Sequence, residues 1–269
     1  MNINQAVMNE YFVELKNVTL KYGRDDSSLA LNGLNITVKK GEFIAVVGPS
    51  GCGKSSLMKI VTGLQPISRG VIQVGGNVVK EPLNFVGMAF QSSSLLPWRT
   101  VLENVLLPLE IVEPYAKSFK KNYKKYCEKA SSLLELVGLQ GYEKKFPWQL
   151  SGGMQQRVQL CRAIIHEPSL LMLDEPFGAL DMFTREELWS ILQGLWMEKK
   201  PTIILVTHDL REAVFLADRV LVMSSRPGKI IHESIVGQSR PRELKSSYQK
   251  ESVDLIAELR SCIQEARIH

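Results

Sequence analysis

Short apolar runs alternate with helical spacings of apolar residues along much of the chain. Residues 43–47, 170–173 and 203–206 are unbroken apolar runs, which are typical of strands buried on both faces. Residues 12–20 instead alternate between apolar and polar positions, as a half-buried strand does, and the alternation continues over 31–38. We therefore predict an α/β fold in which an antiparallel sheet leads into buried strands.

A glycine-rich loop connects the first buried run to a predicted helix. The loop consists of Gly48, Pro49, Ser50, Gly51, Cys52, Gly53, Lys54, Ser55 and Ser56, and Leu57, Ile60, Val61 and Leu64 follow it at helical spacing. This order fits the phosphate-loop pattern of Gly, four residues, Gly, Lys and Ser or Thr. Glycine lets the backbone fold around a phosphate, and the free N–H groups at the helix start point toward it. The alternative is a turn that binds nothing, which the flanking strand and helix disfavour.

Three side chains near this loop suit nucleotide chemistry. Lys54 adds a positive charge over the outer phosphates, and the hydroxyl of Ser55 is placed to ligate Mg²⁺. Tyr22, just after the first predicted strand, is a candidate to stack on a purine ring. The alternative for Tyr22 is a tyrosine at a strand end that packs on its own sheet.

A second glycine pair stands at the start of another predicted helix. Ser151 is a good N-cap, and Gly152 and Gly153 follow it. One face of this helix is apolar, made of Met154, Val158, Cys161 and Ile165. Its free N–H groups form a second place where an anion could be held, although one nucleotide does not need two such places.

Two buried runs end in residues that can act on a phosphate. The run at 170–173 ends in Asp174 and Glu175. A carboxylate at such a strand end can hold Mg²⁺ directly or through water, and the second is free to act as general base. His208 follows the run at 203–206 and could contact a γ-phosphate, although a lone histidine at a strand end is often structural.

Composition and charge place the chain among ordinary globular proteins. It has 269 residues, 45% of them hydrophobic, with a net charge of +5. A mildly basic balance suits a protein near an anionic membrane surface or one that handles polyanions. The four cysteines show no C-x-x-C pair, which indicates a reduced cytosolic compartment. No apolar run approaches ~20 residues and no secretory signal is evident, so we expect another chain to hold the protein at any membrane.

Residues 114–135 are rich in lysine. Four aromatic residues recur at spacings of four, four and three, which predicts one helix with an aromatic face and a basic remainder: Tyr115, Phe119, Tyr123 and Tyr126. One interpretation is a surface for membrane headgroups or nucleic acid. The favoured one is a solvated helix whose aromatic side chains pack on its own domain.

Together these motifs resemble the ATP-binding subunit of an ABC (ATP-binding cassette) transporter. The resemblance rests on the phosphate loop 48–56, Gln91 at the start of a loop, the signature 150–153, the strand 170–174 with Glu175, residues 178–181 and His208. Residues 96–105, 174–181 and 225–229 are similar to the nitrate, sulfonate and taurine importer ATPases. The resemblance implies a P-loop NTPase (RecA-like) core with an antiparallel β subdomain and an inserted α-helical signature subdomain.

The resemblance also implies roles for single residues. Tyr22 would stack on adenine, and residues 50–56 would cradle the phosphates. Mg²⁺ or its waters would be held by Ser55, Gln91 and Asp174. Glu175 would be the base and His208 would hold the γ-phosphate, with Lys54 and Gln91 completing the catalytic set. Two subunits would pair head to tail, so that Ser151, Gly152 and Gly153 of one close on ATP held by the other, with Asp181 also among the nucleotide-binding residues.

On the same grounds we expect residues 1–235 to form the ATP-binding domain, with a helical subdomain inserted at about 92–160. Residues 236–269 would be a C-terminal helical extension that packs on its own domain or makes a regulatory contact. The implied activity is an ATPase at the cytoplasmic face of the membrane that powers an importer. Expected partners are a second ATPase subunit, permease subunits and a solute-binding protein, but no nucleic acid. The alternatives are an ABC ATPase acting on ribosomes or DNA, and a subunit that remodels a membrane complex.

Overall fold

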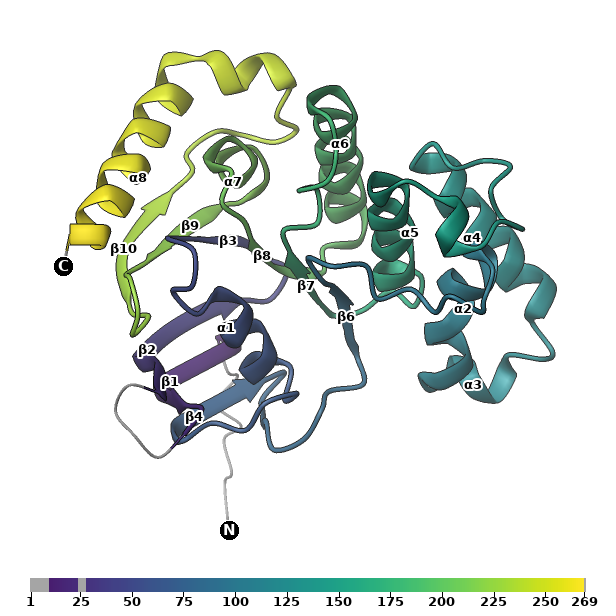
Figure 1. The fold of residues 1–269 in the computed structure, drawn as a ribbon, viewed down its shortest axis with the longest axis horizontal. Coiled ribbons are helices and arrows are strands. Elements are labelled where there is room, and N and C mark those ends of the chain that lie inside the picture. The colour runs from purple at the N-terminus through teal and green to yellow at the C-terminus, as the bar shows by residue number, and fades with distance from the viewer. Residues whose placement is uncertain (1–9, 24–27, 269) are drawn as a thin grey trace, which may run out of the picture.

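The computed structural model describes residues 10–23 and 28–268, which form two sheets and a set of helices (Figure 1). The first sheet has four antiparallel strands in the order β2-β1-β4-β5. Their bounds are Tyr11–Lys21 (β1), Leu29–Lys39 (β2), Arg69–Val74 (β4) and Asn77–Val78 (β5). The antiparallel sheet predicted near the N-terminus is therefore confirmed.

The second sheet has six strands in the order β10-β9-β3-β8-β7-β6. All of its neighbouring pairs are parallel except β10 with β9. The strands are Phe43–Val47 (β3), Val86–Ala89 (β6), Leu170–Asp174 (β7), Thr202–Val206 (β8), Arg219–Met223 (β9) and Ile230–Ile235 (β10). Every residue of β3, β7 and β8 is buried, as the unbroken apolar runs predict.

Alternate residues of these central strands enter two different hydrophobic cores. In β3, Ile44 and Val46 pack with α1 (Lys54–Val61) and the antiparallel sheet. Phe43, Ala45 and Val47 point the other way, into the larger core beneath the remaining helices. In Figure 1 the antiparallel sheet and α1 accordingly lie on one side of the parallel strands, and α6 (Met182–Lys199) and α7 (Leu210–Leu216) lie on the other.

The helix after the phosphate loop is shorter than the apolar spacing predicts. Leu57, Ile60 and Val61 are buried as expected, but Leu64 lies beyond the end of α1 and is 49% exposed. Gly63 ends the helix because it takes a left-handed backbone conformation, with φ of 77°, just after the C-cap.

The lysine-rich segment forms two helices, not the single helix predicted. These are α3 (Tyr115–Ser118) and α4 (Tyr123–Leu136). Tyr115 and Tyr126 would lie about 16 Å apart along one continuous helix, yet their ring centroids are 6.2 Å apart. The chain turns between α3 and α4 and brings these rings together.

Helices α2 (Val101–Ile111) and α5 (Gly152–Ile164) pack with α4 against the larger core, and two short 3-10 helices span Pro147–Gln149 and Leu244–Tyr248. The last helix is α8 (Lys250–Ile268). Its Leu259 is fully buried in that core, which agrees with the expectation that the terminal helix packs on its own chain. Within residues 10–23 and 28–268, no helix has the length and apolar content needed to span a bilayer.

Glu212 is an acid in the interior of the fold, under the end of β8. It is 3% exposed, and the hydroxyl of Thr207 donates to its Oε2 at 3.0 Å. Its Oε1 has no hydrogen-bond partner among the described residues. Burial raises the pKa of Glu212 to about 8, with the negative charge of Asp209 adding to the effect. The carboxyl group is therefore protonated in the folded protein at neutral pH.

Glu212→Gln should weaken the dependence of stability on pH between about 4.5 and 8. The unfolded chain releases this proton near the ordinary pKa of 4.5, and the folded chain holds it up to about 8. Between these values the group lowers the free energy of unfolding by ~1.4 kcal/mol for each unit that the pH rises. Urea unfolding at several pH values should show this loss in the wild type and not in Glu212→Gln. Equal slopes in the two proteins would contradict the assignment, and Glu187→Gln, at an exposed position, is the control.

Candidate functional site

Four neighbouring parallel strands deliver their following residues to one edge of the sheet. The order β3-β8-β7-β6 places the ends of these strands side by side. The phosphate loop follows β3, His208 follows β8, Glu175 follows β7 and Gln91 follows β6. Ligands of open α/β sheets bind at this carboxyl edge.

The phosphate loop needs glycine at defined positions. Gly53 has φ of 108°, and a Cβ there would lie 2.6 Å from Cδ2 of Leu31. Gly51 has φ of 77° with open space where a Cβ would be. The loop thus wraps tightly on the side of β2 and stays open at Gly51.

Lys54 lies inside this loop. Its Nζ donates to the carbonyl oxygens of Gly48 at 3.0 Å and Pro49 at 2.9 Å, and its side chain is 8% exposed. Cys52 is also buried, with Sγ 3.8 Å from the same Nζ. Burial raises the pKa of Cys52 and Lys54 opposes the rise, so Cys52 fills the loop as a neutral thiol.

Residues in the first turn of α1 contact Asp174 and Tyr22, two residues for which the sequence predicts a role in nucleotide binding. The hydroxyl of Ser55 hydrogen-bonds the carboxylate of Asp174, and the hydroxyl of Ser56 lies 2.8 Å from that of Tyr22. Tyr22 is 53% exposed, so its ring is not packed into its own sheet. The structure therefore brings Tyr22 to the mouth of the phosphate loop with its ring accessible.

Asp174 and Glu175 are neighbours in very different surroundings. Asp174 is 7% exposed, and burial raises its pKa while the hydrogen bond from Ser55 lowers it. Glu175 takes a left-handed backbone conformation, with φ of 46°, and its N–H donates to Val206 O at 2.8 Å. This turn aims the Glu175 side chain away from the strand and toward the neighbouring loops.

Both oxygens of the Glu175 carboxylate have partners from other strands. Gln91 Nε2 donates to Oε2 at 2.9 Å, and His208 Nδ1 lies 3.2 Å from Oε1. Glu175 is thus bracketed by the residues that follow β6 and β8. Three residues that the resemblance assigns to one catalytic set are therefore neighbours in the structure.

The second glycine pair lies elsewhere in the molecule. The Ser151 hydroxyl accepts from Met154 N at 3.3 Å, which confirms the predicted N-cap of α5. Ser151 and Gly152 are exposed, while a Cβ on Gly153 would lie 2.7 Å from Cδ2 of Leu180. In Figure 1 α5 and α1 lie on opposite sides of β6 and β7. The structure therefore does not bring Ser151 and the phosphate loop together within one chain.

The loop 178–181 is tied to three helices by contacts that sequence reasoning missed. Gln156 of α5 accepts from Ala179 N at 3.0 Å. Arg185 of α6 donates to Leu180 O at 3.1 Å and pairs with Asp209, the N-cap of α7, at 3.0 Å. Gln156 and Ala179 are 23 residues apart and Arg185 and Asp209 are 24 apart, so no local spacing in the sequence signals these two contacts.

Asp181 itself caps α6. Its carboxylate accepts from Thr184 N at 3.1 Å, and this hydrogen bonding lowers the pKa of Asp181. Asp181 is exposed, so it can serve as a cap and still meet another molecule.

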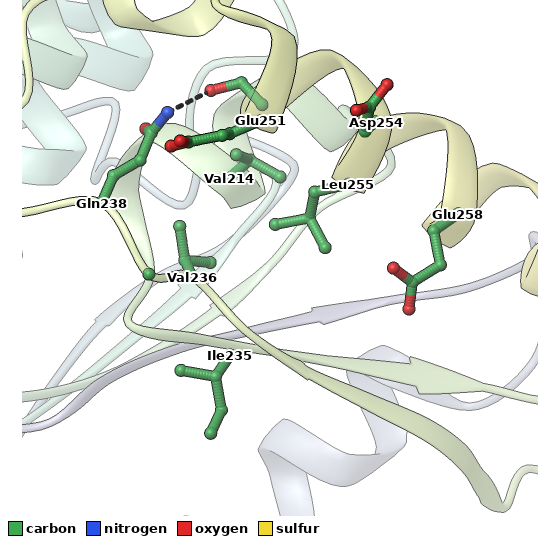
Figure 2. A pocket seen from close by; sticks show the side chains of 10 residues that line it. Val214, Ile235, Val236, Gln238, Glu251, Asp254, Leu255 and Glu258 are labelled. Carbon is green, nitrogen blue, oxygen red and sulfur yellow. Dashed lines mark hydrogen bonds between the residues drawn. The ribbon is translucent and has the colours of Figure 1, made fainter.

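A separate hollow of about 400 Å³ lies between α8 and the end of β10, and Figure 2 shows the side chains that line it. Glu251, Asp254 and Glu258 line it on the α8 side, and Ile235 and Val236 lie below them. A hydrogen bond between Gln238 and Ser252 closes one end. Three carboxylates would repel a triphosphate, so this hollow is not the nucleotide site.

Comparison with known proteins agrees with the family resemblance seen in the sequence motifs. A family model described as ABC transporter matches residues 31–178. The chain is 46% identical over 200 residues to the aliphatic sulfonates import ATP-binding protein of Bacillus licheniformis, covering 74% of each chain. It is 43% identical over 202 residues to the taurine import ATP-binding protein of Escherichia coli, covering 75% of this chain and 76% of the other.

The fold is also that of a solved ATP-binding cassette. A dimeric cassette in a post-hydrolysis state, bound to ADP and phosphate, superposes with a TM-score of 0.75 at 31% sequence identity. The match covers 84% of this chain and all of the other. The P-loop NTPase fold predicted from the motifs is therefore confirmed, and this chain belongs to the ABC transporter family.

Proposed function

We propose that this protein is the ATP-binding and hydrolysing subunit of an importer for a small solute of the nitrate, sulfonate or taurine class. One observation carries the proposal: the phosphate loop, Glu175, Gln91 and His208 meet at the carboxyl edge of the parallel sheet. The import ATPases that this chain resembles support the transport role.

The nucleotide would be held by the phosphate loop and by Tyr22. The backbone N–H groups of residues 50–56 would bind the phosphates, and Lys54 would exchange its carbonyl partners for phosphate oxygens. Tyr22 would stack on the adenine ring, for which its exposed position at the loop is suited. The open space beside Gly51 gives the phosphates room.

The residues present also fit Mg²⁺, which when bound neutralises phosphate charge. The ligands would be the Ser55 hydroxyl and the Asp174 carboxylate, already in contact, with Gln91 nearby through Glu175. In the described part of the chain no group of three His, Cys, Asp or Glu could hold a metal unaided. This donor set suits Mg²⁺, which takes few protein ligands and keeps phosphate and water.

Glu175 would act as the general base toward the attacking water. Gln91 and His208 position its carboxylate from either side, and the backbone turn at Glu175 fixes its direction. His208 is 65% exposed in its side chain, so it is free to reach the γ-phosphate. General base catalysis of this kind typically contributes ~10²–10⁴ in rate.

The complete site would need a second subunit, either another copy of this chain or a close relative. Ser151 and Gly152 are exposed at the start of α5, on the far side of β6 and β7 from α1. Their N–H groups, with Gly153, would cap the nucleotide of the opposite subunit. The dimeric cassette that this chain resembles supports such pairing, and Asp181 would lie at that interface.

The proposed organisation assigns residues 1–235 to the ATP-binding domain, of which 1–9 and 24–27 lie outside the described residues. Residues 92–160 would be an inserted helical subdomain, because α2 to α5 lie between β6 and β7, which pair directly. Residues 236–269 would be a C-terminal extension.

Permease subunits would hold the protein at the cytoplasmic face of the membrane, with a solute-binding protein in the full system. Co-purification with ribosomes or DNA instead would favour a non-transport ATPase.

Glu175→Gln should bind ATP and lose most of its hydrolysis. The amide keeps the hydrogen-bonding shape of the carboxylate but cannot take a proton, so turnover should fall by about a hundredfold or more. ATP should then hold the variant as a stable dimer, measured by gel filtration with and without ATP. Glu187→Gln, on the exposed face of α6, is the control. Normal turnover by Glu175→Gln would remove Glu175 from the role of base.

Ser151→Arg should inactivate the dimer by blocking the nucleotide of the opposite subunit. We expect hydrolysis by the pure variant to fall about tenfold or more, part of it through loss of the α5 N-cap. Mixing it with Lys54→Ala should restore activity, because each heterodimer then contains one intact shared site. Ser190→Arg, an exposed position on α6, controls for bulk and charge. Full activity of the pure Ser151→Arg dimer would contradict a shared site.

A further inference from the structure

The net charge of the chain is concentrated in one short segment. Residues 115–129 contain six lysines and one acid, Glu128, which amounts to the whole formal charge of +5. The other residues contain 27 basic and 27 acidic side chains. A balanced protein with one strongly basic segment has a directional field, which attracts and orients it on an anionic surface.

Aromatic contacts hold α3 and α4 together at the turn between them. Phe119 stacks on Tyr126 with ring centroids 5.9 Å apart, and Tyr115 meets Tyr126 edge to face at 6.2 Å. The hydroxyls of Ser118 and Tyr126 lie 2.9 Å apart. Tyr126 is 8% exposed and packs in the larger core. Most of the aromatic face predicted from the sequence thus turns inward and leaves the lysines outside.

The lysines of this segment are largely without acidic partners. Lys120, Lys121, Lys124 and Lys125 are exposed, and none has an ion pair within the described part of the chain. Lys117 pairs only with Glu113, at 3.5 Å, and remains 81% exposed. We name the surface formed by Lys117, Lys120, Lys121, Lys124 and Lys125 the lysine corner.

Two exposed apolar side chains accompany the charge. Tyr123 is 48% exposed at the start of α4, and Ile111 is 67% exposed at the end of α2, just before α3. Tyrosine is favoured where hydrocarbon meets headgroups. Figure 1 shows α3 and α4 at one end of the long axis of the molecule, opposite α8. A charge at this end of the long axis exerts the largest torque on the subunit, so it orients the subunit most strongly.

From these observations we infer that the lysine corner binds the anionic lipid headgroups of the membrane. The inference rests on the proposed function in one respect, that the subunit works beside a membrane. The use of lysine alone favours lipid over nucleic acid. Lysine is a compact point charge suited to a diffuse layer of headgroups, whereas bidentate recognition of single phosphates favours arginine. Lipid contact would orient the subunit independently of its contact with a permease.

The test measures binding of the purified full chain to vesicles that contain no permease. One set is phosphatidylcholine alone, and the other contains one third phosphatidylglycerol. Two variants carry the same change in net charge. One neutralises the corner with Lys120→Gln, Lys121→Gln, Lys124→Gln and Lys125→Gln, and the control neutralises exposed lysines elsewhere with Lys40→Gln, Lys80→Gln, Lys229→Gln and Lys250→Gln.

The wild type should sediment with anionic vesicles and not with neutral ones. Binding should weaken as salt rises, because such attraction is screened. The corner variant should lose roughly a thousandfold in partitioning at low salt, while the control variant stays within about threefold of the wild type. ATP hydrolysis, measured on the same preparations, should be unchanged in both variants.

Several results would overturn the inference. Equal losses in the two variants would assign binding to overall charge, and absence of wild-type binding would refute it directly. If duplex DNA or RNA bound the wild type but not the corner variant, and vesicles bound neither, the lysine corner would be assigned to nucleic acid. Failure of the proposed function is distinguishable, because it would appear as absent ATP hydrolysis in the wild type whatever the vesicles show.

Discussion

Parallel pairing of β3, β8, β7 and β6 is the constraint on which the candidate site depends. Strands that run in one direction release their following loops at one edge, so residues from distant parts of the sequence meet there. Glu175 reaches Gln91 and His208 only because their strands flank β7. The pairing is held by burial of the strands on both faces, between two cores. The positions of the site residues therefore depend on the packing of the hydrophobic interior.

The same edge gathers several acids, and the structure offsets their mutual repulsion in different ways. Asp174 accepts from Ser55, and Asp209 caps α7 and pairs with Arg185. Glu175 lies against an amide and an imidazole. Glu212 is the exception, because burial keeps it protonated. The side chain of Glu175 is 18% exposed at this edge of the sheet.

A chain of polar contacts links the start of α5 to the residue before α7. Gln156 binds Ala179, Leu180 accepts from Arg185, and Arg185 pairs with Asp209 next to His208. Gly153 packs closely on Leu180, where even one added carbon would collide. These contacts join α5 through the loop 178–181 to Asp209, the residue next to His208. The network is therefore contiguous from α5 to the residue that precedes α7.

The sequence by itself determined the features that local chemistry controls: the buried runs, the glycines of the phosphate loop and the Ser151 cap. It did not determine where α1 ends, because a left-handed Gly63 exposes Leu64 despite its helical spacing. It also predicted one helix where the chain folds back and stacks Phe119 on Tyr126. Strand order, and with it the cluster around Glu175, was decided by tertiary structure alone. The reason is that pairing and core packing join residues with no fixed separation along the chain, so no local pattern encodes them.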